Sequence, residues 1–241
     1  METHAQPTAD GARRGAELAA NLAAVEGRIA AACASAGRPR TDVTLVVVTK
    51  THPASDVRLL AGLGVRDVGE NRDQEAAPKA KATEDLDLTW HYVGQLQTNK
   101  AKSVAGYADV VHSLDRVRLA RSLSAAAERQ QRTITALLQV SLDEDPARGG
   151  VSAADLAELA DVVAGAPNLI LGGVMAVAPL GVEPARAFAG LREIATRLRE
   201  AHPTANMVSA GMSNDLEAAI EAGATHVRIG TAVLGVRPSL R

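Results

Sequence analysis

The sequence predicts a closed (β/α)₈ barrel, in which eight parallel strands are surrounded by helices. Short runs of β-branched and apolar residues alternate with segments of helical periodicity along the whole chain. Eight strand candidates occur, which is the number that closes such a barrel. No change of composition marks a linker, so we expect residues 13–241 to form one domain after a disordered leader, residues 1–12. An open, doubly wound sheet is the alternative fold.

The first expected element is a helix over about residues 15–36, which precedes the repeating pattern. Gly37 and Pro39 follow it and are typical of a helix end. Cys33 lies in its alanine-rich part, where a buried thiol is a better interpretation than a reactive one. The apolar stripe of this helix is Leu18, Leu22, Val25 and Ile29.

The strand candidates then follow one another with helix-compatible segments between them. Clear helical patterns cover residues 56–64, 115–131 and 184–202. The strand candidates are residues 43–50, 65–70, 88–94, 108–114, 134–142, 169–177, 205–211 and 226–233.

The composition argues against several classes of partner. The net charge is −2 and aromatic residues make up 2% of the chain, so neither a basic surface nor a base-stacking platform for nucleic acid is expected. No apolar run is long enough to cross a membrane, and the polar N-terminus has no secretory signal. A single cysteine excludes an internal disulfide and fits a reducing compartment. We therefore expect a cytoplasmic protein without membrane or nucleic-acid partners.

Lys50 ends the apolar strand in the segment VTLVVVTKTHP, residues 43–53. A lysine at a strand end can extend its ammonium group into solvent, or it can act as a nucleophilic amine. In a barrel the carboxyl ends of the strands surround the mouth where functional groups gather. This placement favours the functional interpretation. The segments that contain Asn71, His112 and Met175 end other strands at the same rim.

Residues 208–231 indicate a phosphate site on the last two strand-to-helix loops. The seventh strand runs into Ser209, Gly211 and Ser213, with Ser213 as the expected helix N-cap. Gly230 and Thr231 form the second loop, at the end of the eighth strand. Small residues at a helix start expose backbone N–H groups, and barrels often bind phosphate on these two loops.

Arg228 is expected to point into the barrel. In HVRIG, Val227 and Ile229 share the apolar outer face, so the arginine lies on the opposite, inner face. A buried guanidinium needs an acceptor, which could be Glu70, Asp67 or a ligand. An amine, a phosphate site and an inward arginine together suggest pyridoxal 5'-phosphate (PLP). A Schiff-base aldolase acting on a sugar phosphate would use the same parts.

Several segments resemble the pyridoxal phosphate homeostasis protein family. They are VVTKTHP, GENRDQE, WHYVGQLQTNKAK, VHSLD, GGVMAV, SAGMSNDLEAAIEAGATHVRIG and the terminal GVR, and the match spans about residues 15–237. The resemblance implies a barrel like the N-terminal domain of alanine racemase, with PLP held on Lys50 as a Schiff base. It also implies a role in PLP (vitamin B6) homeostasis and delivery to apo-enzymes. The cofactor-binding residues that we expect are Lys50, Asn71, Met175, Ser209, Gly211, Met212, Ser213, Arg228, Gly230 and Thr231.

The sequence departs modestly from the family pattern, and no departure removes a phosphate donor. The family often has a basic residue where His52 stands and methionine where Ala210 stands. Arg148 stands where a lysine is common. His52 and Arg148 could therefore change how substrates or partners approach the mouth.

A PLP-dependent amino-acid racemase is the rival function. Racemisation needs a second acid–base group opposite the lysine. We expect Tyr92 in mid-strand and Tyr107 at the closed end of the barrel, where neither reaches the mouth. His52 and His112 are nearer candidates, but a structural role is at least as compatible with their positions. We therefore expect a monomeric carrier rather than an enzyme, with no metal.

Lys100 and Lys102 lie together at one predicted helix start. They form either a solvated basic turn or a positive surface that attracts and hands over anionic PLP. The two interpretations differ in the rate of PLP transfer that a variant lacking both lysines would show.

Overall fold

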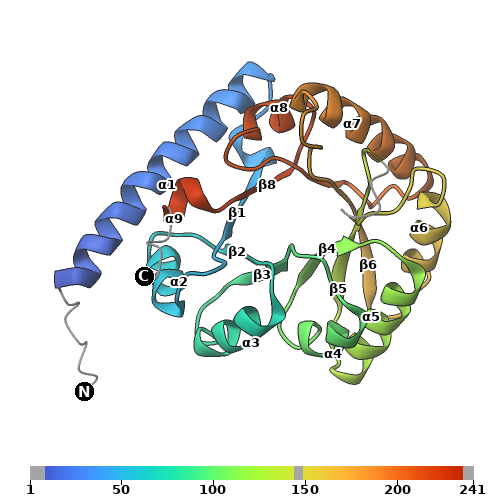
Figure 1. Ribbon diagram of the computed structural model, residues 1–241, viewed down its shortest axis with the longest axis horizontal. Helices are drawn as coiled ribbons and strands as arrows, with labels where there is room; N and C mark the ends of the chain where they lie inside the picture. Colours follow the sequence, from blue (N-terminus) through green and yellow to red (C-terminus); the bar gives the residue numbers. More distant parts are fainter. Residues whose placement is uncertain (1–8, 144–148, 236–241) are drawn as a thin grey trace.

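Eight parallel strands form a closed barrel in the computed structural model, which describes residues 9–143 and 149–235 (Figure 1). Each strand pairs with the next, and β8 pairs in parallel with β1, which closes the ring and excludes the open sheet. The strands are β1 (Thr44–Val48), β2 (Asp67–Glu70), β3 (Thr89–Tyr92), β4 (Val110–Leu114), β5 (Ile134–Gln139), β6 (Leu169–Met175), β7 (Met207–Ser209) and β8 (His226–Ile229).

The helices form an outer ring around this barrel (Figure 1). The long helix α1 lies outside the alternating pattern and packs against α2, α8 and α9, so it covers the wall where the barrel closes. The helices are α1 (Ala9–Ser35), α2 (Ala54–Gly62), α3 (Asp73–Ala82), α4 (Ala101–Val104), α5 (Val117–Arg129), α6 (Leu156–Ala164), α7 (Pro184–Ala201), α8 (Leu216–Glu221) and α9 (Thr231–Leu234), with short 3-10 turns η1 (Arg40–Asp42) and η2 (Thr98–Lys100).

Strand register separates an outer apolar layer from the barrel interior. Val46 pairs with Arg228, and Val47 pairs with Ile229. Ile229 packs in a buried cluster with Leu18 of α1, so it faces outward. Because side chains alternate along a strand, Arg228 and Val46 face inward, as the sequence predicts.

The barrel interior has an apolar part and a polar part. Its apolar part is a small cluster of Val110, Leu137 and Met175, with Met207 packed against it. The polar part consists of histidine, serine, arginine and aspartate side chains that hydrogen bond to one another. These polar groups come from β2, β3, β4, β7 and β8, and those on β7 and β8 lie where the expected phosphate loops begin.

The structure also corrects the N-terminal boundary and confirms the environment of Cys33. Helix α1 begins at Ala9, so residues 9–12, which we expected in a disordered leader, are helical; residues 1–8 lie outside the described residues. Cys33 is buried in this helix, as predicted. In the described part of the chain, no helix combines the length and the apolar character that crossing a bilayer requires.

Candidate functional site

Lys50 lies in a tight turn directly after β1. The N–H of His52 donates to the carbonyl of Thr49 at 3.1 Å, which closes the turn. Thr51 has a φ of 66°, a left-handed conformation that is unfavourable for a β-branched residue. Strained residues of this kind concentrate at functional sites. Lys50 itself is exposed and forms no hydrogen bond or ion pair with any described residue.

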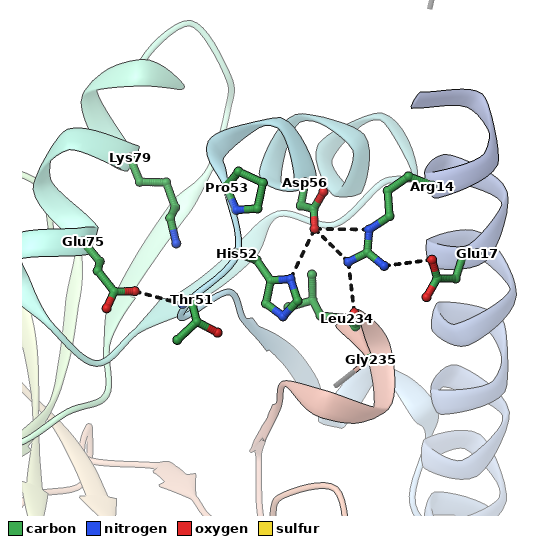
Figure 2. A pocket seen from close by; sticks show the side chains of 10 residues that line it. All are labelled: Arg14, Glu17, Thr51, His52, Pro53, Asp56, Glu75, Lys79, Leu234 and Gly235. Atoms are coloured by element: carbon green, nitrogen blue, oxygen red, sulfur yellow. Dashed lines mark hydrogen bonds and ion pairs between the residues drawn. The ribbon is translucent and has the colours of Figure 1, made fainter. Parts of the chain in front are cut away.

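The Lys50 turn is held from both sides by charged residues (Figure 2). On one side the N–H of Thr51 donates to Glu75 Oε2 at 2.9 Å. On the other, His52 Nδ1 lies 3.4 Å from Asp56, whose carboxylate accepts from Arg14 of α1 at 2.7 Å. These residues line a pocket of about 870 Å³ beside the turn. The backbone of the turn is therefore fixed, whereas the Lys50 side chain has no hydrogen-bond or ion-pair partner in the described part of the chain.

A buried ion pair supports the base of this turn, and sequence reasoning missed it. Lys79 donates to the carbonyl of Thr49 at 2.8 Å and pairs with Glu70, which also accepts from Thr49 Oγ1 at 2.7 Å. Burial raises the pKa of Glu70, and its bonds to Lys79 and Thr49 oppose that shift. Because the amine of Lys79 is committed to this cluster, Lys50 is the lysine available at the end of β1.

The two loops expected to bind phosphate present unpaired backbone donors. The N–H groups of Ser213, Asn214, Gly230 and Thr231 donate to no described acceptor. An added Cβ at Gly230 would lie 3.2 Å from the carbonyl oxygen of Val48, two residues before Lys50. The loop after β8 therefore lies against the end of β1, close to the lysine.

The helix start on the first of these loops differs from the prediction. Helix α8 begins at Leu216, and Ser213 is not its N-cap. Instead, Asp215 Oδ1 accepts from the N–H of Met212 at 2.6 Å, and the N–H of Asp215 donates to the carbonyl of Met212 at 3.2 Å. These two bonds close the turn that precedes the helix, whose N-cap is Asp215 rather than Ser213. Gly223, with a φ of +99°, follows the end of this helix.

Arg228 is buried and has no direct carboxylate partner among the described residues. Its Nη1 donates to Ser209 Oγ at 2.6 Å and its Nη2 donates to the carbonyl of Ala176 at 3.0 Å. Neither Glu70 nor Asp67 pairs with it, so the structural ion pair considered from sequence is wrong. Burial lowers the pKa of Arg228 to about 10, with Asp215 acting in the opposite direction. A guanidinium has five N–H donors, so three remain for a ligand.

The other predicted cofactor residues lie around the same end of the barrel but in different environments. Asn71 directly follows β2 and is half-buried, whereas Met175 ends β6 and is buried in the interior apolar cluster. Gly211 has a φ of +91°, which favours glycine, and an added Cβ there would lie 2.7 Å from Ala219 Cβ. Met212 is exposed on the loop after β7.

The residues considered as a second acid–base group for racemisation are buried or hydrogen bonded in the structure. Tyr92 ends β3 rather than lying in mid-strand, and its hydroxyl lies 3.5 Å from the carbonyl of Asn71. Burial raises the pKa of Tyr92 to about 12 and also raises that of Tyr107. His112 is fully buried and hydrogen bonded to other side chains, which supports its structural interpretation.

The other residues singled out from the sequence have different environments. Lys100 lies 3.5 Å from Asp73 Oδ2, and Lys102 is exposed at the start of α4. Ala210 is buried beside Ser209. Arg148 lies outside the described residues.

Comparison with known families first defines the class of protein. Residues 20–238 match the family model of the alanine racemase N-terminal domain. An alanine racemase from Streptomyces coelicolor has the same fold, with a TM-score of 0.71 at 19% identity over 93% of this chain and 59% of that chain. The barrel thus belongs to the alanine racemase N-terminal domain class.

More similar relatives define the family within that class. The pyridoxal phosphate homeostasis protein of Corynebacterium glutamicum is 42% identical over 221 residues, which cover 89% of this chain and 99% of the relative. The Escherichia coli K12 protein of that name is 38% identical over 92% of this chain and 97% of its own length. PipY of Synechococcus elongatus, solved with PLP bound, has a TM-score of 0.80 at 35% identity over 90% of this chain and 100% of that chain. The chain belongs to the pyridoxal phosphate homeostasis protein family.

Proposed function

We propose that this chain binds PLP and serves in its intracellular homeostasis and delivery rather than in catalytic turnover. The observation that carries the proposal is the set of unpaired donors at the end of the barrel. Three N–H donors of the buried Arg228 and the backbone N–H groups of Ser213 and Gly230 have no acceptor among the described residues. Unpaired donors on the buried guanidinium are costly without an acceptor, so an anionic, electron-rich ligand fits this site.

Each part of the site has a role toward that ligand. PLP supplies an aldehyde that condenses with a primary amine, and we assign that amine to Lys50. The loops after β7 and β8 hold the phosphate through their backbone N–H groups and the hydroxyls of Ser213 and Thr231. Arg228 contributes a fixed positive charge, directed at either the pyridine nitrogen or the phosphate. Asn71 and Met175 border the ligand from β2 and β6.

The exposure of Lys50 favours a carrier. An exposed lysine leaves a covalently held cofactor accessible to water and to competing amines, so the cofactor can leave as well as enter. Tyr92, with a pKa of about 12, is poorly suited to exchange protons near neutral pH. The relatives named as homeostasis proteins support the same assignment. We infer that apo-enzymes requiring PLP are the partners, and that the carrier acts in the cytoplasm as a monomer.

Covalent PLP binding is tested by absorbance and intact mass. Wild-type protein incubated with PLP is expected to turn yellow and, after borohydride reduction, to gain one PLP on the peptide containing Lys50. Lys50→Ala should lose this adduct, whereas Lys81→Ala, which changes another exposed lysine, should keep it. An unmodified wild-type protein, or an adduct that persists in Lys50→Ala, would contradict the proposal. A protein that stays colourless with PLP would instead favour the aldolase alternative.

The racemase alternative is tested with the loaded protein. Incubation with L-alanine in deuterated water should leave the α-hydrogen and the configuration unchanged over many hours. Rapid α-deuteration and inversion would show turnover and overturn the carrier assignment.

A further inference from the structure

A continuous chain of buried side chains crosses the interior of the barrel. Arg228 Nη1 lies 2.6 Å from Ser209 Oγ, which lies 2.9 Å from His112 Nδ1. His112 Nε2 lies 2.8 Å from His91 Nδ1, and His91 Nε2 lies 2.9 Å from Asp67 Oδ1. The first four members of this hydrogen-bonded chain are at most 6% exposed: Arg228, Ser209, His112 and His91. The side chain of Asp67, the last member, is 27% exposed.

This hydrogen-bonded chain of side chains joins the two ends of the barrel. Ser209 is the last residue of β7 and belongs to the carboxyl end, whereas Asp67 is the first residue of β2 and belongs to the opposite end. The bond between Ser209 and His112 joins β7 to β4, which are not neighbours in the barrel. It therefore spans the interior rather than following the sheet.

The chemistry of the two terminal groups sets one direction for all four bonds. A carboxylate only accepts, so His91 must donate from Nε2 to Asp67. Neutral His91 then accepts at Nδ1, which requires His112 to donate from Nε2. His112 in turn accepts at Nδ1 from the hydroxyl of Ser209, whose oxygen accepts from the guanidinium, a group that only donates. In this arrangement each imidazole carries a single hydrogen, on Nε2.

A second proton on His112 would break this arrangement. Its Nδ1–H would face Ser209 and leave the serine hydrogen without its acceptor, next to the positive Arg228. Burial lowers the pKa of His112 well below its usual value, and His91, Arg228 and His226 act in the same direction. The neutral form is thus favoured both by the geometry and by the surroundings.

The geometry points to a positioning role for Asp67, His91, His112 and Ser209: they form a one-way hydrogen-bonded chain that holds Arg228 for the ligand. Ser209 then has no hydrogen to offer a phosphate, so it supports Arg228 rather than binding phosphate as the sequence predicts. The positioning of Arg228 for a ligand rests on the proposed function. The hydrogen-bonded chain of side chains is a property of the protein without a ligand.

The direction of the chain is tested in apo protein labelled with ¹⁵N-histidine. Long-range ¹H–¹⁵N spectra report the tautomer and charge of each ring, and His91→Asn and His112→Asn assign the two signals. At pH 7 we expect both rings to be neutral with hydrogen on Nε2. Hydrogen on Nδ1 of His112, or a cationic ring at either position, would overturn the proposal.

The variant Asp67→Asn tests whether the distant carboxylate sets this direction. An amide both accepts and donates, so it also permits the reverse direction. Because Ser209 and Arg228 still favour hydrogen on Nε2, an Nδ1–H form of His112 should appear as a minor population. Asp87→Asn removes an exposed carboxylate before β3, at the same end of the barrel, and should leave the tautomers unchanged. A His112 tautomer that does not respond to Asp67→Asn would contradict the coupling.

PLP binding tests the consequence for the ligand. Asp67→Asn should weaken PLP binding roughly three- to tenfold, as expected for groups coupled in one network. In Ser209→Ala the chain is already cut, so adding Asp67→Asn should cause no further loss. Additive losses, or unchanged PLP affinity in Asp67→Asn, would overturn the positioning role. If wild-type protein does not bind PLP, the proposed function fails. The tautomer measurements then still test the direction of the hydrogen-bonded chain of side chains.

Discussion

Acidification from pH 7 to pH 5 should destabilise the fold by about 2 kcal/mol through His226 alone. His226 lies on the inner face of β8, where its Nδ1 lies 2.8 Å from Thr225 Oγ1 and its ring centroid lies 6.3 Å from that of His91. Burial lowers the pKa of His226 to about 4. His91 and Arg228 add to that shift, while Asp67 opposes it.

The sign of this pH effect follows from the number of protons that the folded and the unfolded states bind. In the unfolded chain a histidine has a pKa of about 6.5, so it takes up a proton as the pH falls through that value. Folded His226 stays neutral until about pH 4. The unfolded state therefore binds more protons in this window, and the free energy of unfolding falls as the pH falls. Integration from pH 7 to pH 5 gives the loss of about 2 kcal/mol. Buried His112, whose pKa is also lowered, adds a loss in the same direction.

Urea unfolding at pH 7, 6 and 5 measures this loss. The variant His226→Asn keeps a polar group beside Thr225 but cannot titrate, so its loss should be about 2 kcal/mol smaller than that of wild type. Identical pH dependence in wild type and His226→Asn would refute the reasoning.

Three further predictions concern the Lys50 turn and its surroundings. Thr51→Gly should raise the free energy of unfolding by roughly 0.5–1 kcal/mol in urea titrations because it removes left-handed strain, and Thr51→Val should give no gain. Lys79→Met should lower it by about 3–5 kcal/mol because Glu70 is left buried without its cation, and the double variant Glu70→Gln/Lys79→Met should recover much of the loss. Lys100→Ala/Lys102→Ala should slow PLP transfer to an apo-enzyme in stopped-flow absorbance, and a transfer rate equal to that of wild type would argue against their electrostatic role.

Local patterns were sufficient to predict the architecture. The alternation of apolar runs and helical segments predicted eight strands in the observed order, and the parity of Val227 and Ile229 predicted an inward Arg228. The position of Lys50 after β1 followed from the end of an apolar run. These features depend on backbone periodicity, which nearby residues determine.

The predicted site was less complete because several roles depend on the exact ends of elements. Tyr92 proved to end β3, which brings its hydroxyl to Asn71. The helix after β7 begins at Leu216 rather than near Ser213, because Asp215 bonds back to Met212. A shift of one or two residues is small in the sequence, but it changes which donors remain free.

The sequence by itself determined the order of the elements, the parity of the inward residues and the family to which the chain is similar. Only the tertiary structure decided that Ser209 meets His112, 97 residues away, and that Lys79 rather than Arg228 pairs with Glu70. Such partners face one another across a closed barrel, and their separation depends on the stagger between strands. That stagger results from packing of the whole ring, so no local pattern encodes it.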